Sequence, residues 1–484
     1  MQLLRERTGD KAAPTSAPGA APGAAPAAPM PDAAQALRDL PPVRRRLTIG
    51  QFARITRNQL ESLPPETFRE RIVHTRVFGR DRYHVMDPDL IGEALVRRAD
   101  IMRRAPEMRL ALVPLLGEGL LTAEDSNWRW QRRAVAAGFQ PARLADMVPT
   151  MIAAAERTRD RWLAGGDAPL AVAHEMMRTT FDIIVETMFD GGAGLDVARV
   201  ARSITDYAHP LGWVLAYTLA RLPDWTPYPG RARAREATTY LRGTLANILA
   251  ERRARPSARA DLVAMLLGAV DPQDGRTMSD EEIIDNLLTF VTAGHETTSL
   301  GLAWTFHLLA HHPEVEARLF AELDAVCPGG TVTPEAMPRL TYTRQVFSEA
   351  MRLYPPAPMI SRYVAEDMEL GGVRIPAGAM LVVPIYAVHH HALLWQEPER
   401  FDPDRFAPDV AAARSRYAYM PFGAGPRVCI GNGFAVQEAV AILAVLLARL
   451  RLRDVATAPS TPVMKVTLRP SPDLAMRAEE RHRS

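Results

Sequence analysis

Cysteine is scarce in this chain of 484 residues, in which Cys327 and Cys429 are the two cysteines. Two cysteines cannot form a disulfide framework, so the sequence favours a reducing compartment. The charged start of the chain is not followed by an apolar segment of the kind that forms a signal peptide. We therefore expect a cytoplasmic protein.

Long hydrophobic runs and an excess of one charge are also missing. The longest apolar run near the C-terminus spans residues 439–448, between Glu438 and Arg449. A membrane-spanning helix needs about 20 apolar residues, so this run predicts a buried core helix and no integral membrane anchor. The 58 basic and 56 acidic side chains leave a net charge of +2. That balance excludes a strongly basic protein that binds nucleic acid.

The composition is that of a globular protein, since 47% of the residues are hydrophobic and 24% are charged, which is enough to build a large core. Residues 12–34 differ, because they are rich in Ala, Pro and Gly and nearly free of large apolar side chains. Such a segment cannot offset its ordering entropy by burial. We expect a disordered tail over residues 1–39 and a single domain over residues 40–484.

Helical spacing of apolar residues dominates the chain. Beyond the N-terminal region, it predicts helices over 142–163, 176–189, 240–253 and 261–267. A longer helix starts at the capping box formed by Ser279 and Glu282 and stops near Pro313. Its thirty-odd residues would span about 45 Å, enough to cross a whole domain.

A small β part is expected between residues 368 and 386. Two short apolar segments, 368–370 and 373–375, flank Gly371 and Gly372, which is a hairpin signal. Residues 379–386 form a further strand candidate. The predicted fold class is therefore mainly α with a small β part.

The strongest chemical signal is the glycine-rich segment 422–431, which contains Cys429 and precedes a predicted helix. Glycine lets a backbone turn tightly and approach a flat ligand. A cysteine close to a helix N-terminus is expected to have a lowered thiol pKa. A thiolate in such a loop suits axial ligation of haem iron, and Arg427 is placed to pair with a haem propionate. The alternative for an isolated cysteine is a buried structural residue in a turn.

This segment resembles the haem loop of the cytochrome P450 (haem-thiolate monooxygenase) superfamily, F-x-x-G-x-R-x-C-x-G. Every fixed position of that motif is matched, by Phe422, Gly425, Arg427, Cys429 and Gly431. The resemblance implies the cytochrome P450 fold, with a long central helix over the haem and the cysteine loop beneath it. It also implies haem b (iron protoporphyrin IX) as cofactor and Cys429 as the ligand of its iron.

The long helix contains a second motif over residues 293–298, similar to the oxygen-activation motif A-G-x-[DE]-T-[TS] of the family. Gly294 would let the helix pass close to a flat cofactor. A threonine hydroxyl inside a helix can bond back to a carbonyl and open the helix locally. The resemblance implies that Glu296 and Thr297 deliver protons. As alternatives, both are ordinary helix residues, or His295 and Glu296 begin a zinc motif whose second histidine is missing at Ser299.

Two further motifs follow the family order. Glu349 and Arg352 share one helix face, and the resemblance implies that they join Arg400 in a buried structural network. Trp128 and Arg132 are similar to the family's W-x-x-x-R pair that holds a haem propionate, and Arg362 is a third propionate partner. The residues expected to bind the cofactor are Cys429, Arg427, Phe422, Gly423, Gly431, Trp128, Arg132, Arg362, Ala293 and Gly294.

The resemblance implies an enzyme that inserts one oxygen atom of dioxygen into a substrate. Apolar residues in the variable segments favour a substrate such as a fatty acid or terpene. The candidate pocket residues are Leu115, Leu116, Met359 and Ile360. Only 55 residues (484 − 429) follow Cys429, too few for a fused flavin domain. Electrons from NAD(P)H are therefore expected through a separate ferredoxin or flavodoxin with its reductase.

Three alternatives have less support. The same haem would serve a peroxide-dependent peroxygenase, but peroxide already brings the protons that Glu296 and Thr297 would deliver. A non-enzymatic haem sensor has little use for an acid and threonine pair.

Three consecutive histidines at 389–391 suggest a metal site, but in an extended segment they would point to opposite faces. A structural role is favoured for them.

Overall fold

The computed structural model describes residues 57–77, 79–189, 196–219, 222–223, 225–255, 261–271 and 273–481. These residues belong to one compact unit, residues 32–484. The expected tail over residues 1–39 and its boundary at residue 40 lie outside the described residues.

The described chain is mainly helical with a small β part, as predicted. Its α-helices are α3 (Pro88–Gly92), α4 (Pro106–Leu116), α5 (Asp125–Ala136), α6 (Pro141–Ala164), α7 (Val172–Met188), α8 (Val197–Ala208), α9 (Leu211–Leu219), α10 (Arg231–Ala254), α11 (Leu262–Leu267), α12 (Asp280–His311), α13 (Pro313–Val326), α14 (Thr341–Leu353), α15 (Ile385–His389), α16 (Pro408–Ala413) and α17 (Asn432–Leu447). Its strands are β1 (Ile72–Val77), β2 (Arg80–Val85), β3 (Met102–Arg104), β4 (Leu170–Ala171), β5 (Ile360–Val364), β6 (Met368–Leu370), β7 (Val373–Ile375), β8 (Met380–Val383), β9 (Leu450–Asp454), β10 (Thr461–Met464), β11 (Leu468–Ser471) and β12 (Ala475–Glu480).

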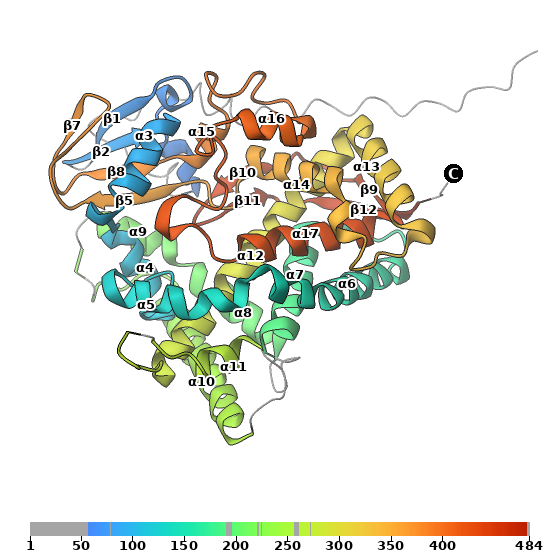
Figure 1. Cartoon of the computed structure of the whole chain (residues 1–484), viewed down its shortest axis with the longest axis horizontal. Helices are drawn as coiled ribbons and strands as arrows, with labels where there is room; N and C mark the ends of the chain where they lie inside the picture. The colour runs from blue at the N-terminus through green and yellow to red at the C-terminus, as the bar shows by residue number, and fades with distance from the viewer. Residues whose placement is uncertain are drawn as a thin grey trace, which may run out of the picture. The chain divides into compact units, whose positions relative to one another are not determined.

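The long helix α12 is the central element. The capping box predicted at Ser279 and Glu282 is present, and Pro313 opens the next helix directly after α12 ends. Most residues in its second half are buried, and it packs against α7, α14 and α17 (Figure 1). Its 32 residues span about 48 Å. None of the helices within the described ranges is long and apolar enough to cross a membrane.

The largest sheet among the described residues has five strands in the order β1-β2-β8-β5-β3. It lies to one side of the view, away from α6, α13 and α14 (Figure 1). The predicted hairpin is confirmed, since β6 and β7 pair around Gly371 and Gly372, whose φ angles of 58° and 79° need glycine. The strand expected to reach Tyr386 ends at Val383, because Pro384 begins the short helix α15.

The three consecutive histidines lie at the end of α15, so the expected extended conformation is wrong. All three are buried, and one ring nitrogen of each histidine donates to a backbone carbonyl. The acceptor of His389 is Arg352 at 3.1 Å, that of His390 is Tyr386 at 2.8 Å, and that of His391 is Glu70 at 3.0 Å. These bonds support the structural role that the sequence favoured.

Candidate cofactor site

The cysteine loop is closed by the backbone N–H of Cys429, which donates to the carbonyl of Phe422 at 2.9 Å. Gly423 and Gly425 have φ angles of 77° and 75°, a conformation that L side chains rarely adopt. A Cβ at Gly425 would also stand 2.0 Å from the carbonyl oxygen of Leu95, too close for any side chain. Gly431 is different, since its φ of −85° is open to any residue. The loop therefore requires glycine at positions 423 and 425 but not at 431.

Cys429 has accessible surface, so its side chain is open to a ligand. Burial raises the pKa of Cys429, whereas the backbone N–H of Gly431 and the charge of Arg132 lower it. The expectation of a lowered thiol pKa is therefore wrong for the protein alone. Loss of hydration outweighs the start of α17, because a thiolate is costly where water is excluded.

Helix α12 presents Ala293 and Thr297, two residues of the second motif, to an accessible space. Ala293 is exposed although Val291 and His295 beside it are buried. The Thr297 hydroxyl donates to the carbonyl of Ala293 at 2.9 Å, which is the expected back-bond, but α12 stays continuous there. Gly294 does not face this space. A Cβ there would lie 2.8 Å from Ile184 of α7, so glycine serves the close packing of two helices and not an approach to a cofactor.

Glu296 is held in an ion pair that the sequence did not predict. Its Oε1 accepts from Arg469 Nη2 at 2.5 Å and Nε at 3.0 Å, and from the hydroxyl of Thr467. The carboxylate side chain is 13% exposed. Arg469 lies on β11, 173 positions away, and no motif marks it, so local pattern could not reveal the contact.

Three arginines gather on the other side of the cysteine loop. Burial and the charges of Arg427 and Arg362 lower the pKa of Arg104 to about 9. Burial, with the charge of Arg362, lowers the pKa of Arg427 to about 10, and burial also lowers the pKa of Arg362. Arg104 Nε is buried and has no hydrogen-bond partner among the described residues. Because the like charges of three arginines crowd together and the nearby carboxylates Glu124 and Asp125 offset them only in part, the cluster fits an anionic ligand.

A cavity of about 470 Å³ opens over this cluster. Its lining residues are Leu95, Ala99, Asp100, Met102, Arg103, Glu124, Asp125, Trp128, Arg129, Arg362, Ala424, Pro426 and Arg427. The Arg427 guanidinium lies 4.4 Å from the centre of the Trp128 ring, a cation–π contact, and donates to the carbonyl of Ala123 at 2.8 Å. Arg132 is not in this lining and lies near the Cys429 sulfur instead. The structure thus brings together Trp128, Arg362 and Arg427, and adds Arg104.

This arrangement fits haem, the cofactor implied by the resemblance. Haem carries two propionates, and the arginine cluster offers charged donors for anionic oxygens, among them the Nε of Arg104, unpartnered within the described residues. The accessible Cys429, on a loop whose turns depend on Gly423 and Gly425, suits ligation of the haem iron. Arg104 was missed by the sequence analysis because it stands in a three-residue strand without a motif; only its pairing with β5, which carries Arg362, shows its place.

The Glu349 and Arg352 pair lies beneath this region with both side chains fully buried. Two hydrogen bonds of 2.7 Å join them, and Arg352 also donates to the carbonyls of His389, Pro398 and Arg400. Arg400 therefore joins through its backbone, while its guanidinium is 64% exposed and pairs with Glu397.

The third side chain of this network comes from Arg405. Its Nε is 3.4 Å from Glu349 Oε1, and 12% of its side chain is exposed. The expected partner Arg400 is replaced by Arg405 because the chain turns between them and sends the Arg400 side chain outward.

Glu438 is a buried acid that the sequence analysis did not assign. It lies on α17, is fully buried, and neither carboxyl oxygen is hydrogen-bonded within the described residues. Burial raises the pKa of Glu438 well above its ordinary value, and the nearby Thr298 hydroxyl acts against this shift.

The four candidate pocket residues divide into two groups. Leu115 and Leu116 end α4 and are each 2% exposed, so they are core residues. Met359 and Ile360 are half-buried, and Ile360 Cδ1 lies 3.4 Å from the Cβ position of Gly423 in the cysteine loop. The second pair is therefore the one beside the cofactor site.

Comparison with known proteins agrees with the site. Residues 41–476 match the family described as Cytochrome P450. The chain is 32% identical to cyclooctatin synthase of Streptomyces melanosporofaciens, over 89% of this chain and 91% of that protein. It is 32% identical to cyclooctat-9-en-7-ol 5-monooxygenase of the same organism, over 84% and 88%. Pentalenene oxygenase of Streptomyces avermitilis is 31% identical, over 87% and 92%.

Solved structures show the same fold. The haem domain of cytochrome P450DA superposes with a TM-score of 0.77 at 27% identity, covering 85% of this chain and 90% of that domain. A triple mutant of that domain gives a TM-score of 0.78 over 92% and 98%. The family match, the relatives and the cysteine loop agree, and this chain belongs to the cytochrome P450 family of haem-thiolate monooxygenases.

Proposed function

We propose that this monooxygenase inserts oxygen into a small apolar molecule and receives electrons from a separate ferredoxin or flavodoxin with its reductase. The observation that carries the substrate class is the apolar lining beside the cysteine loop. Met359 and Ile360 are half-buried there, and Met359 packs against Ala105, Met380 and Val382. These contacts of Met359 are apolar, which favours a hydrocarbon ligand beside it.

Exposed apolar residues on two neighbouring helices add support. Met108 and Leu110 on α4 are 42% and 43% exposed, and Trp213 on α9 is 46% exposed. Helices α4 and α9 pack against each other. Apolar side chains on a surface near a binding cleft favour an apolar ligand. The names pentalenene oxygenase and cyclooctat-9-en-7-ol 5-monooxygenase denote unsaturated carbon skeletons, which is the same class.

Each part of the site has a role in this mechanism. Bound haem supplies the redox-active iron at which dioxygen is activated. Cys429 would hold that iron, and Arg104, Arg362 and Arg427 would hold the propionates through charge-assisted hydrogen bonds. Trp128 fixes the Arg427 guanidinium by its ring face. The glycine turns at 423 and 425 would let the loop backbone approach the flat cofactor closely.

Proton delivery is assigned to Thr297 and Glu296. The Thr297 hydroxyl holds its proton toward the carbonyl of Ala293, and its oxygen remains available to accept another. Glu296 is bound to Arg469, so this pair must open before the carboxylate can turn and pass a proton. Arg469 is 39% exposed, which places the pair at the edge of solvent.

Replacing Glu296 by Gln is expected to lower product formation by about 10²-fold, since a positioned acid contributes about 10²–10⁴-fold. The amide keeps the size of the side chain but cannot carry the proton. The spectral shift caused by substrate binding should stay unchanged. Turnover and binding are measured on the same preparation, with Glu397→Gln, an exposed acid paired with Arg400, as the control. Equal turnover in the Glu296 variant and wild type would remove Glu296 from proton delivery.

Replacing Arg104 by Gln is expected to weaken haem binding by about tenfold or more, because a hydrogen bond to a charged group contributes about 1.5–3 kcal/mol. The apoprotein should become more resistant to urea, since one of three crowded like charges is removed. Haemin titration and urea unfolding of the apoprotein measure the two effects. Arg374→Gln is the control, because its side chain is 82% exposed, pairs with Asp367 and does not line this cavity. Unchanged haemin affinity would contradict the role of Arg104.

The proposed function is tested with the purified holoprotein. Apolar alkenes and their alcohols, fatty acids and charged polar compounds are screened for the shift in the haem spectrum that substrates cause. Binding compounds are then incubated with NAD(P)H, a ferredoxin and its reductase, or with peroxide alone. We expect oxygenated product from the alkenes and alcohols with the reductase system. Binding of polar compounds only would contradict the substrate class, and turnover with peroxide alone would favour a peroxygenase.

A further inference from the structure

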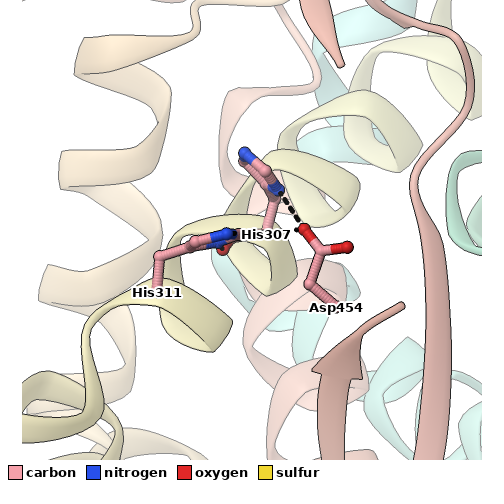
Figure 2. Close-up of side chains that lie close together, drawn as sticks. All are labelled: His307, His311 and Asp454. Carbon is pink, nitrogen blue, oxygen red and sulfur yellow. Dashed lines mark hydrogen bonds and ion pairs between the residues drawn. The ribbon is translucent and has the colours of Figure 1, made fainter. Parts of the chain in front are cut away.

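We propose that His307, His311 and Asp454 form a binding site for a divalent transition-metal ion, separate from the haem. His307 and His311 lie four positions apart on α12, so their side chains share one face near the end of this helix. Asp454 is the last residue of β9. One ligand atom from each residue lies within 4.8 Å of the other two. Figure 2 shows the three side chains pointing toward one another.

The distances from Asp454 to the two histidines fit atoms that bind one metal ion better than they fit direct hydrogen bonds. Asp454 Oδ2 is 3.4 Å from His311 Nε2 and 3.6 Å from His307 Nδ1. A hydrogen bond between such atoms would be about 2.7–3.2 Å long. Ligand atoms of a tetrahedral ion with bonds of about 2.0–2.1 Å stand about 3.3 Å apart. Small rotations of the side chains would complete the set.

The hydrogen bonds around the cluster orient the ligand atoms. His311 Nδ1 lies 2.8 Å from the carbonyl of His307, which can only accept, so Nδ1 donates this bond and Nε2 is the ring nitrogen on the side of Asp454. Asp454 Oδ1 accepts from the N–H of Ala456 at 2.8 Å, which turns Oδ2 toward the histidines. His311 Nε2 and Asp454 Oδ2 therefore face each other across the centre of the cluster. A bonded partner for the unused ring nitrogen is typical of metal-binding histidine.

The second, independent observation is His307 itself. The residue is 6% exposed, and its Nδ1 is buried without a hydrogen-bond partner among the described residues. A buried nitrogen without a partner costs free energy. A cation placed between it and Asp454 would remove that cost.

Two imidazoles and one carboxylate are ligands that suit Zn²⁺ and related ions, with the remaining positions open to water. The ion would join the end of the central helix α12 to the edge strand β9, which are 143 residues apart in the chain (454 − 311). His311 is half-buried and the Asp454 side chain is 25% exposed, so an ion can reach the site from solvent. The alternative is a proton on His311 that pairs it with Asp454 without any metal.

Zinc binding to the chelator-treated holoprotein distinguishes these alternatives. Titration calorimetry with Zn²⁺ alone should show one ion per chain in wild type. The affinity should fall at least about tenfold in His311→Ala and in Asp454→Asn. The matched control is His74→Ala, which removes the histidine of an exposed pair with Asp81 far from α12. This control should bind zinc like wild type. Zinc should also raise the unfolding temperature of wild type and of the control, but not that of the two site variants.

The proposal is overturned if wild type binds no zinc, or if the site variants bind it as tightly as wild type. Circular dichroism and the haem spectrum show whether each variant is folded. If a variant fails to fold, X-ray absorption at the zinc edge of the wild-type protein decides. Two imidazoles in the first coordination shell support the site, and a shell without imidazole contradicts it.

Discussion

Replacing Cys429 by His is expected to reduce monooxygenase turnover by about 10²-fold or more while the protein still folds and binds haem. The thiolate pushes electron density toward O–O cleavage, and a neutral imidazole does not. Loss of one group that stabilises charge at a reacting centre typically costs about 10²–10³-fold. The Cys429 side chain is accessible, so we expect room for the larger ring. Turnover and the spectrum of the reduced, carbon-monoxide-bound protein measure the effect.

The control is Cys327→Ala, which removes the other cysteine. Cys327 is fully buried after α13, so its loss should cost some stability and leave the carbon-monoxide spectrum unchanged. The Cys429 variant should show a spectrum typical of imidazole ligation. If wild type and Cys429→His give the same spectrum, sulfur is not the iron ligand and the assignment of Cys429 is wrong.

Replacing Glu349 by Ala is expected to lower the free energy of unfolding by about 3–5 kcal/mol and to reduce the amount of folded holoprotein. The change leaves Arg352 fully buried with its charge uncompensated. Arg352 would also lose the partner that aims it at the carbonyls of His389, Pro398 and Arg400. Urea unfolding, followed by circular dichroism and by haem absorbance, measures the loss.

Arg400→Ala is the matched control for this network. The sequence placed the Arg400 side chain in the network, but its guanidinium is exposed and only its carbonyl takes part. We expect a change within about 0.5 kcal/mol, as for surface substitutions away from special features. Arg405→Ala should cost more, because its side chain lies beside Glu349. A large loss in Arg400→Ala would show that its side chain, and not its backbone, supports the fold.

Local sequence patterns predicted helix starts and turns well where the residues that define them are close neighbours in the chain. The capping box at Ser279 fixed the start of α12, and the glycine pair at 371–372 marked the β6–β7 hairpin. Both depend on residues within a few positions of one another. The expected strand over 379–386 failed at Pro384, where the fold starts helix α15.

The roles of single site residues were harder to predict. Gly294 belongs to the second motif, yet it serves helix packing against Ile184. The expected low pKa of Cys429 considered the helix end but not the burial that raises it. Arg132 lies near the sulfur and outside the lining of the arginine cavity. In each case the deciding neighbour comes from another part of the chain.

The sequence by itself determined the family and the order of the motifs, since the spacing around Cys429 and the motif at 293–298 need no tertiary information. The tertiary structure decided which charges meet. Arg469 reaches Glu296 from 173 positions away, and Arg104 joins Arg362 because β3 pairs with β5. His311 likewise meets Asp454 only because β9 lies against the end of α12. Electrostatic contacts depend on distance in space and on burial, and neither follows from local spacing.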